Sequence, residues 1–376
     1  MAFTVLSDAH VKQILASLSS PEVSELVSSL EHALVQYSCQ DEKQYQPHRA
    51  VIARPDGQNT LFMPASTPDL VGFKIVGISP SKAPAPASGS GSGTPPPALK
   101  SALTLCDETG QAIGVLNAAE LTSFRTALGS MLLYRFRRNT ENIVVFGAGK
   151  QALWHIRLAI LLRGKDIRTI TVINRSAART QQLVETLTGD AQSAWPSHVK
   201  LNVFDEQKDR DAALETLMVD SDVIFCTTPS TQPLFPASFL TSENARAKTR
   251  FLSAIGSYRL DMQEIDPELL KLVVDPSSVF AGSAYQSGAI AVDSLEGCLQ
   301  EAGELVKAEL ATEKLLEIGR ILDPKSTADQ VELKKWLEHG LVIYKSVGVG
   351  VMDLAIGKDL LHLAKSRKVG ITSDDF

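Results

Sequence analysis

The feature that most constrains the fold is a glycine turn between an apolar run and a helix-like segment. Residues 142–146 are almost wholly apolar, which is typical of a parallel strand covered on both faces. Gly147-x-Gly149-x-x-Ala152 follows at once. In this context the first glycine permits a tight turn, the second lets backbone approach a pyrophosphate, and Ala152 allows close helix packing. The pattern predicts a dinucleotide site that includes Gly147, Gly149, Gln151 and Ala152.

Strand-like and helix-like runs alternate after this turn. The alternation predicts a doubly wound parallel sheet, and therefore an α/β chain with a Rossmann-type domain. We expect helices over 151–163, 177–188 and 209–218, and strands over 169–173, 199–203, 222–226, 250–255 and 272–274.

The flanking parts of the chain have other patterns. Two helices fit 8–38, short strands fit 49–78, and a helix fits 118–137. Residues 80–97 are rich in Pro, Gly and Ser and have little to bury, so we expect a flexible surface loop. Strand-like runs at 102–106 and 112–116 form a hairpin, which makes this loop an insertion between strands. After Val292 we expect helices over 293–321 and 328–339, then the segment Ile343-Tyr344-Lys345-Ser346-Val347-Gly348 and a last helix to about 365.

Composition excludes several classes of protein. The chain has 376 residues, a hydrophobic fraction of 44% and a net charge of −6. It lacks the basic footprint of a nucleic-acid partner. The four cysteines are scattered, which favours free thiols in a reducing compartment. There is no secretory pattern at the N-terminus and no apolar stretch of membrane-spanning length, so we expect no membrane association and a cytoplasmic protein.

The end of the second strand indicates which nicotinamide cofactor is bound. NAD sites usually carry an acidic residue there, whereas this chain has Asn174-Arg175-Ser176, with Arg179 a turn further on. A guanidinium would pair with a 2′-phosphate. The pattern favours NADP(H), with NAD(H) as the alternative. Arg175 is otherwise an ordinary exposed residue at a helix start.

Other chemistry has weaker support. No histidine or cysteine spacing indicates a metal site, and His48, His155 and His339 are isolated. Three cations outside the predicted nucleotide domain remain candidates: Arg49, Lys74 and Arg125. Lys74 is unusual because it lies within an apolar strand, where a buried amine is costly unless it has a role.

The motifs together resemble the ornithine cyclodeaminase/mu-crystallin family. They occur in the family's order over almost the whole chain, and the insertion at 80–97 departs from the pattern. The matching stretches are 47–49, 62–65, 72–76, 122–127, 147–152, 174–176, 255–261 and 345–348.

The resemblance implies a two-domain subunit and a role for each candidate residue. It implies that Arg49 and Arg125 hold a substrate carboxylate and that Lys74 lies beside the reacting carbon. It adds Thr227, Gly256 and Ser257 to the cofactor site. It also implies a homodimer, with an α+β substrate and dimerisation domain over 1–130 and 322–376 and an NADP(H)-binding Rossmann domain over 131–321.

The family divides by chemistry. By the resemblance, cyclodeaminases carry an aspartate where this chain has Tyr258. The mu-crystallin branch, which is similar to ketimine reductases, also lacks an acidic residue at this position. We therefore expect a C–N oxidoreductase, an NADPH-dependent reductase of cyclic ketimine carboxylates such as pyrroline- or piperideine-2-carboxylate. Three alternatives stay open: ornithine cyclodeaminase with bound NAD, an amino-acid or opine-type dehydrogenase, and a non-catalytic crystallin-like NADPH-binding protein.

Overall fold

The chain divides into two compact units in a computed structural model. The first contains residues 1–16, 41–122 and 350–376, and the second contains residues 17–40 and 123–349. Each unit is described by itself. The residues that the structure describes are 2–79, 98–189, 195–204, 209–257, 259–283, 288–326 and 329–376.

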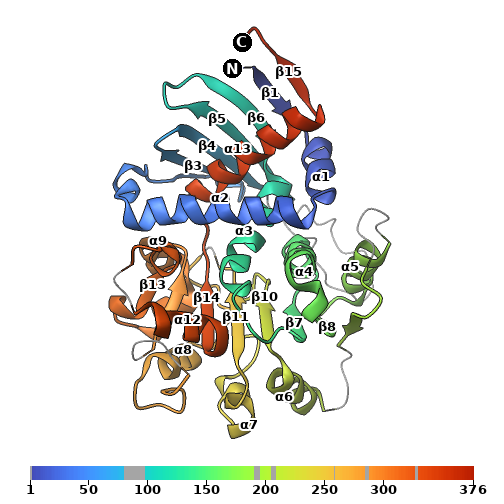
Figure 1. Ribbon diagram of the computed structural model, residues 1–376, viewed down its shortest axis with the longest axis vertical. Helices are drawn as coiled ribbons and strands as arrows, with labels where there is room; N and C mark the ends of the chain where they lie inside the picture. Colours follow the sequence, from blue (N-terminus) through green and yellow to red (C-terminus); the bar gives the residue numbers. More distant parts are fainter. Residues whose placement is uncertain are drawn as a thin grey trace. The chain divides into compact units, whose positions relative to one another are not determined.

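A seven-stranded sheet forms the first unit (Figure 1). Its strand order is β15-β1-β6-β5-β4-β3-β2, and all ladders are antiparallel except β1 with β6. Its strands are β1 (Phe3–Leu6), β2 (Ala50–Ala53), β3 (Asn59–Thr67), β4 (Leu70–Ser79), β5 (Ala98–Asp107), β6 (Ala112–Asn117) and β15 (Ile371–Ser373). Its helices are α1 (Asp8–Ala16), the 3-10 helix η1 (Glu42–Tyr45) and α13 (Gly350–Arg367).

The predicted insertion falls between two paired strands. Ser79 at the end of β4 pairs with Ala98 at the start of β5, and β5 pairs with β6 as the predicted hairpin. Residues 80–97 themselves, expected to form a surface loop, lie outside the described residues.

Helix α13 packs closely on one face of this sheet. A Cβ atom at Gly72 would lie 2.8 Å from the side chain of Leu354, and one at Gly357 would lie 2.6 Å from that of Leu103. Glycine at these positions lets helix and sheet approach each other. Lys74 lies on this covered face, because it pairs with the fully buried Leu103 in the neighbouring strand.

An eight-stranded, all-parallel sheet forms the core of the second unit (Figure 1). Its order is β13-β12-β14-β11-β10-β7-β8-β9. Its strands are β7 (Asn142–Phe146), β8 (Thr169–Ile173), β9 (Lys200–Val203), β10 (Val223–Cys226), β11 (Arg250–Ala254), β12 (Ile290–Val292), β13 (Leu315–Glu317) and β14 (Leu341–Lys345). The order reverses between β7 and β10, which is where such sheets bind ligands at their carboxyl ends.

The helices of this unit are α2 (Ser20–Cys39), α3 (Ala119–Tyr134, mostly in this unit), α4 (Lys150–Arg163), α5 (Ala177–Thr188), α6 (Arg210–Asp220), α7 (Glu243–Arg246), α8 (Pro267–Val274), α9 (Leu295–Glu301), α10 (Gly303–Ala308), α11 (Ile318–Leu322) and α12 (Gln330–His339), with the 3-10 helices η2 (Gly164–Asp166), η3 (Ala237–Leu240) and η4 (Thr312–Lys314). Helices α2 and α3 precede the first strand of this sheet, and the other helices of the unit lie between its strands in the sequence. The predicted α/β class with a Rossmann-type sheet is confirmed.

Two predictions about individual elements are wrong. The expected strand over 272–274 is the end of α8, which starts after the Asp266 N-cap and buries Leu269, Leu270, Val273 and Val274 on one helical face. The expected continuous helix over 293–321 is interrupted by β13, and the short strand β12 just before it was not foreseen.

The division between the units also differs from the predicted boundaries. Residues 322–349 were expected in the first domain, but β14 pairs with β11 and β12 of the second sheet. Helix α2 likewise belongs to the second unit, where a Cβ atom on Gly319 of α11 would lie 2.0 Å from Leu34 O. Helix α2 and strand β14 therefore extend the nucleotide-type unit at both ends of the chain.

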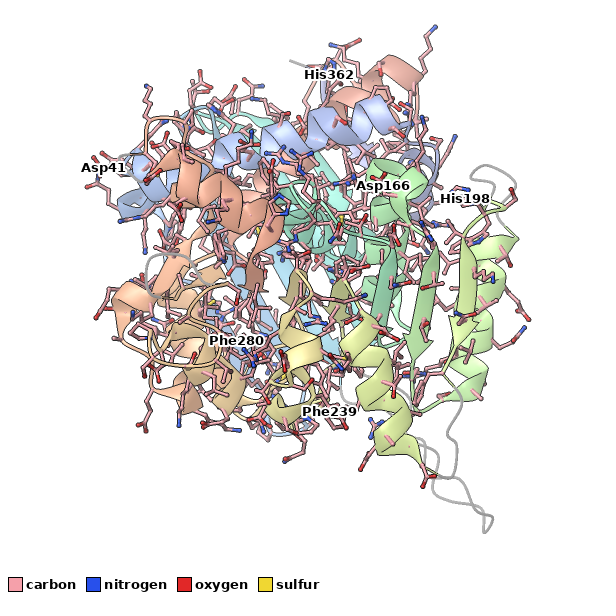
Figure 2. All side chains as sticks on the ribbon, turned by 60° about the horizontal axis from the view of Figure 1, so that its bottom comes forward. Asp41, Asp166, His198, Phe239, Phe280 and His362 are labelled. Atoms are coloured by element: carbon pink, nitrogen blue, oxygen red, sulfur yellow. The ribbon has the colours of Figure 1, made fainter. Side chains whose placement is uncertain are left out.

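An apolar cluster fills the space between this sheet and its helices. It includes Phe146 and Ile343 from strands, and Phe239 and Phe280 from connecting segments (Figure 2). The cluster fixes the strand ends from which the candidate site residues project. Among the described helices, none is long and apolar enough to cross a membrane.

Candidate functional site

The turn after β7 holds Gly147 in a conformation that favours glycine. Its φ is 110°, in the left-handed region where a side chain adds strain. A Cβ atom there would come within 2.7 Å of Thr227 Oγ1. The Gly147 N–H donates to Ile173 O over 2.8 Å, and Thr227 Oγ1 donates to Phe146 O over 2.6 Å. Neighbouring strands therefore fix the turn, and Thr227 uses its hydroxyl to hold it.

The N-terminus of α4 has room for a ligand. Gly149 is the N-cap, and a Cβ atom there would meet nothing within 4 Å. Ala152 is fully buried. Gln151 Oε1 is buried and has no hydrogen-bond partner in the described part of the chain. Open space, helix N–H groups and an unpartnered acceptor fit the pyrophosphate and a ribose hydroxyl of a nicotinamide nucleotide.

The end of β8 carries the residues expected at the 2′ position. Asn174 Nδ2 donates to Ser176 O over 2.9 Å, and Ser176 is the N-cap of α5, accepting from the Arg179 N–H over 3.4 Å. Arg175 and Arg179 are exposed. The two guanidinium groups thus lie near the start of one helix, on a connection that two local hydrogen bonds stabilise.

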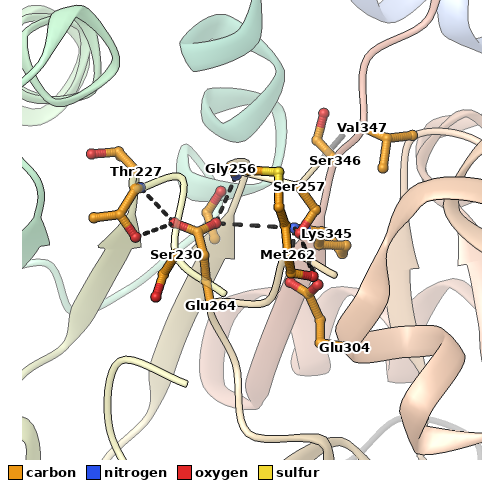
Figure 3. Close-up of polar contacts among 12 residues, drawn as sticks. Thr227, Ser230, Gly256, Ser257, Met262, Glu264, Glu304, Lys345, Ser346 and Val347 are labelled. Atoms are coloured by element: carbon orange, nitrogen blue, oxygen red, sulfur yellow. Dashed lines mark hydrogen bonds and ion pairs between the residues drawn. The ribbon is translucent and has the colours of Figure 1, made fainter. Parts of the chain in front are cut away.

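One buried carboxylate joins the loops that follow β10 and β11 (Figure 3). Glu264 accepts the N–H of Thr228 over 2.6 Å and the N–H of Gly256 over 2.7 Å. Gly256 has no space for a side chain, because a Cβ atom would lie 1.9 Å from Thr228 O. Burial raises the pKa of Glu264. Glu264, which the motifs did not indicate, therefore holds Gly256 and the residue after Thr227 at one edge of the sheet.

A buried lysine links this carboxylate to a second one. Lys345 Nζ lies 2.8 Å from Glu304 and 4.0 Å from Glu264, and all three side chains are fully buried (Figure 3). It also donates to Ser257 Oγ over 2.9 Å, and Ser257 donates to Glu304 over 2.8 Å. Burial opposes the charge of Lys345, but the two carboxylates outweigh it and raise its pKa. The hydroxyl of Ser257, expected at the cofactor, belongs to this ion cluster.

In the first unit, Lys74 forms an ion pair on the covered face of the sheet. Its Nζ lies 2.6 Å from Asp353 Oδ2, and each side chain is 1% exposed. Asp353 lies in the first turn of α13. Isolated charges at this burial would be very costly, so each group stabilises the charged form of the other. Asp353 was not identified from the sequence.

The two arginines occupy different settings. Arg49 precedes β2 and is half-buried, and desolvation lowers the pKa of its guanidinium. Strand β3 separates β2 from β4, so Arg49 is one strand removed from the strand of Lys74. Arg125 lies on α3 in the second unit and is 4% exposed. The guanidinium lies against Gly348, where a Cβ atom would come within 2.7 Å of Arg125 Nη1.

Three further expectations concern Tyr258, the cysteines and metal binding. Tyr258, which stands where a cyclodeaminase would have aspartate, lies outside the described residues. All four cysteines are free. Within the described ranges no group of three His, Cys, Asp or Glu side chains is placed to hold a metal ion.

Comparison with known proteins agrees with this architecture. The chain is 28% identical to an uncharacterized protein of Saccharomyces cerevisiae, over 96% of this chain and 97% of the yeast protein. It is 24% identical to a Delta(1)-pyrroline-2-carboxylate reductase of Bacillus cereus, over 93% and 94% of the two chains. A solved NAD-bound dimer of an archaeal alanine dehydrogenase matches the fold with a TM-score of 0.70, 20% identity and full coverage of both chains.

A family model matches nearly the whole chain, including both units. The match covers residues 8–367, and the model is that of the ornithine cyclodeaminase/mu-crystallin family. The match includes every described helix and strand except β1 and β15, the outermost strands in the sequence. The chain belongs to the ornithine cyclodeaminase/mu-crystallin family.

Proposed function

We propose that the protein is an NADPH-dependent reductase of cyclic ketimine carboxylates, which it converts to cyclic amino acids. Members of its family are NAD(P)-dependent oxidoreductases or cyclodeaminases. The observation that carries the proposal is Lys74, a buried ammonium held by one carboxylate in a chain that also has a nucleotide-binding turn. A lysine kept charged in this way can donate a hydrogen bond or a proton to an imine nitrogen.

Residues of the second unit would hold the cofactor. The turn at Gly147 and Gly149 would receive the pyrophosphate at the N-terminus of α4, as helix N-termini do for phosphates generally. Arg175 and Arg179 are exposed and would pair with a 2′-phosphate, which makes NADPH the preferred cofactor. When bound, the nicotinamide supplies a hydride for the imine carbon.

Three cations would bind and orient the substrate. Arg49 and Arg125 hold its carboxylate, because guanidinium groups bind carboxylates in a fixed bidentate geometry. Lys74 donates to the ring nitrogen, and Asp353, 2.6 Å from Lys74 Nζ, orients the ammonium group. The carbon–nitrogen double bond becomes a single bond, with one hydride added at C2 and one proton at nitrogen.

We further propose that the protein is a homodimer that associates through the first unit. The face of its sheet opposite α13 exposes Val5, Ile52, Val71 and Phe73, whose side chains are each between 37% and 46% accessible to solvent. Exposed apolar side chains gathered on one sheet face are typical of a protein interface. The similar archaeal alanine dehydrogenase is a dimer.

A cofactor and substrate panel tests the function. We expect NADPH oxidation with five- and six-membered cyclic imine carboxylates, slower oxidation of NADH, and no product from ornithine plus NAD. The proposed reductase function would be rejected if neither cofactor were oxidised, or if ornithine were the only substrate turned over.

Arg175→Ala tests the cofactor preference. Loss of a charged hydrogen bond should raise the apparent Michaelis constant for NADPH about tenfold and that for NADH far less. Arg168→Ala is the matched control, since Arg168 is an exposed arginine at the opposite end of β8. Equal changes for both cofactors in Arg175→Ala would show that Arg175 does not read the 2′-phosphate.

A further inference from the structure

We propose that Asp293 is a positioning residue for Arg125 and acts through the turn at residues 346–348. This inference rests on the proposed role of Arg125 in binding the substrate carboxylate. Asp293 directly follows β12, which pairs with β14 at Ala291 and Val292, and Asp293 is fully buried. Strand β14 ends at Lys345, so the turn begins beside the Asp293 carboxylate.

One carboxylate holds three consecutive residues of this turn. Ser346 Oγ donates to Asp293 Oδ2 over 2.6 Å. The N–H of Val347 donates to both carboxylate oxygens, over 3.2 and 3.1 Å, and the N–H of Gly348 donates to Oδ2 over 2.6 Å. Hydrogen bonds to an ionised acceptor are about twice as strong as neutral ones. The turn is therefore fixed mainly by a single side chain.

The fixed turn supports the guanidinium of Arg125. Gly348 has a φ of 86°, and a Cβ atom there would lie 2.7 and 2.8 Å from the two terminal nitrogens of Arg125 and 3.2 Å from Cζ. The guanidinium thus packs on the bare Cα of Gly348. All of these contacts lie within the second unit.

The chemistry of this arrangement explains why an aspartate is needed. Asparagine at 293 would place an NH₂ group where one carboxylate oxygen lies, and both oxygens face backbone N–H groups. Oδ1 accepts from Ser294 and Val347, and Oδ2 accepts from Val347 and Gly348. In either orientation of the amide the Val347 N–H would face the NH₂ group, two donors would meet, and the turn would move away from residue 293. Arg125 would then lose the packing of its guanidinium on Gly348 without losing its charge.

Chemical modification of arginine tests the inference without any substrate. In Asp293→Asn, we expect phenylglyoxal to modify Arg125 several-fold faster than in the wild-type protein, as measured by mass spectrometry of the peptide. Arg137 is the internal control, because it is 1% exposed and lies in the same unit. Its rate should not change. An unchanged rate at Arg125, or parallel increases at both arginines, would overturn the inference.

A double-mutant cycle tests the same coupling in the reaction. Asp293→Asn should raise the substrate KM about tenfold in the wild-type background and less than about twofold in the Arg125→Ala background, because residues that act through one another are not additive. Equal fold-changes in both backgrounds would overturn the inference. If Asp293→Asn does not fold, Ser346→Ala enters the same cycle with the same expectation.

A matched aspartate separates positioning from general stability. Asp222 is also buried and accepts a backbone N–H, that of Asn142, but it lies at the start of β10. Asp222→Asn should lower the melting temperature and leave the substrate KM unchanged. An equal rise in KM would overturn the positioning role. If the wild-type protein reduces no cyclic imine acid, the proposed function fails, and the modification rates still decide the role of Asp293.

Discussion

A buried lysine is stable only where another charge or a set of acceptors replaces the water it has lost. Lys74 meets this condition through Asp353, at a distance of 2.6 Å and with both side chains 1% exposed. In our proposal the pair keeps a proton available at the substrate nitrogen. The lysine should therefore contribute to turnover rather than to cofactor binding.

Replacing Lys74 tests this role. Lys74→Ala should lower kcat by about a hundredfold or more, the usual contribution of a general acid, while the dissociation constant for NADPH stays the same. Stopped-flow kinetics and nucleotide fluorescence measure the two quantities. Lys358→Ala, which removes an exposed lysine paired with Asp69 in the same unit, is the control and should be unaffected. Normal turnover in Lys74→Ala would show that the lysine is structural.

The sequence indicates Lys74 but not its partner. A lysine within an apolar strand can be recognised from the few residues around it. Asp353 is 279 positions away, and only the packing of α13 on β4 makes the two residues neighbours. Glu264 and Glu304 could not be identified from the sequence for the same reason, because both lie far along the chain from Lys345. Their partner Lys345 belongs to a matching motif, but no local pattern assigns two carboxylates to it.

At the scale of elements, the long and strongly patterned segments could be predicted and the short ones could not. Strand β7, the glycine turn and α4 could be predicted because each is indicated by consecutive residues: an apolar run, two glycines and the helix-like segment that follows them. Strands β12 and β13, with three residues each, exist because they pair with neighbours far along the chain. The apolar run at 272–274 forms a helix because Asp266 and Pro267 start one before it.

A buried histidine connects three elements of the second unit. His155 on α4 contacts Ser130 on α3 over 2.9 Å, and Ser130 contacts Ser253 on β11 over 2.8 Å. The Nδ1 atom of His155 faces Gln151 O over 2.8 Å and must donate to it, so Nε2 accepts from Ser130. Burial lowers the pKa of His155 to about 4. The folded protein thus holds a neutral imidazole.

This histidine makes stability fall in mild acid. The unfolded chain protonates His155 near pH 6.5 and the folded chain only near pH 4, so stability is lost as pH falls through this range. The free energy of unfolding should drop by roughly 2 kcal/mol between about pH 7.5 and pH 5 from this group. In His155→Gln, the free energy of unfolding measured in urea should decrease over the same pH range by about 2 kcal/mol less than in the wild-type protein. His362→Gln, which changes an exposed histidine (Figure 2), should behave as wild type. Equal drops in all three proteins would contradict the assignment.

At the scale of the molecule, the chain contains a unit with a nucleotide-type fold and a unit whose sheet exposes an apolar face. A domain division could be predicted from the sequence, but α2 and β14 could not be assigned, because their contacts rather than their positions decide which unit they join. The exposed face includes Val5 and Val71. Stable dimers bury about 800 Å² on each partner, and this face is our candidate for that area.

Charge on this face should prevent dimerisation. The double variant Val5→Lys/Val71→Lys should sediment as a monomer where the wild-type protein sediments as a dimer, because the lysines would have to be desolvated in the interface. Val331→Lys is the control, since Val331 is 75% exposed on α12 of the other unit. A dimeric double variant would contradict this interface, and a monomeric wild-type protein would contradict the dimer.

The central claim is that hydride passes from NADPH to the C2 carbon of a cyclic imine acid. The most direct measurement uses NADPH carrying deuterium at the transferable C4 position, with pyrroline-2-carboxylate as substrate and the product analysed by NMR and mass spectrometry. We expect proline with one deuterium at C2, in an amount equal to the NADPH oxidised. Unlabelled proline, or NADPH oxidation without any cyclic amino acid, would contradict it.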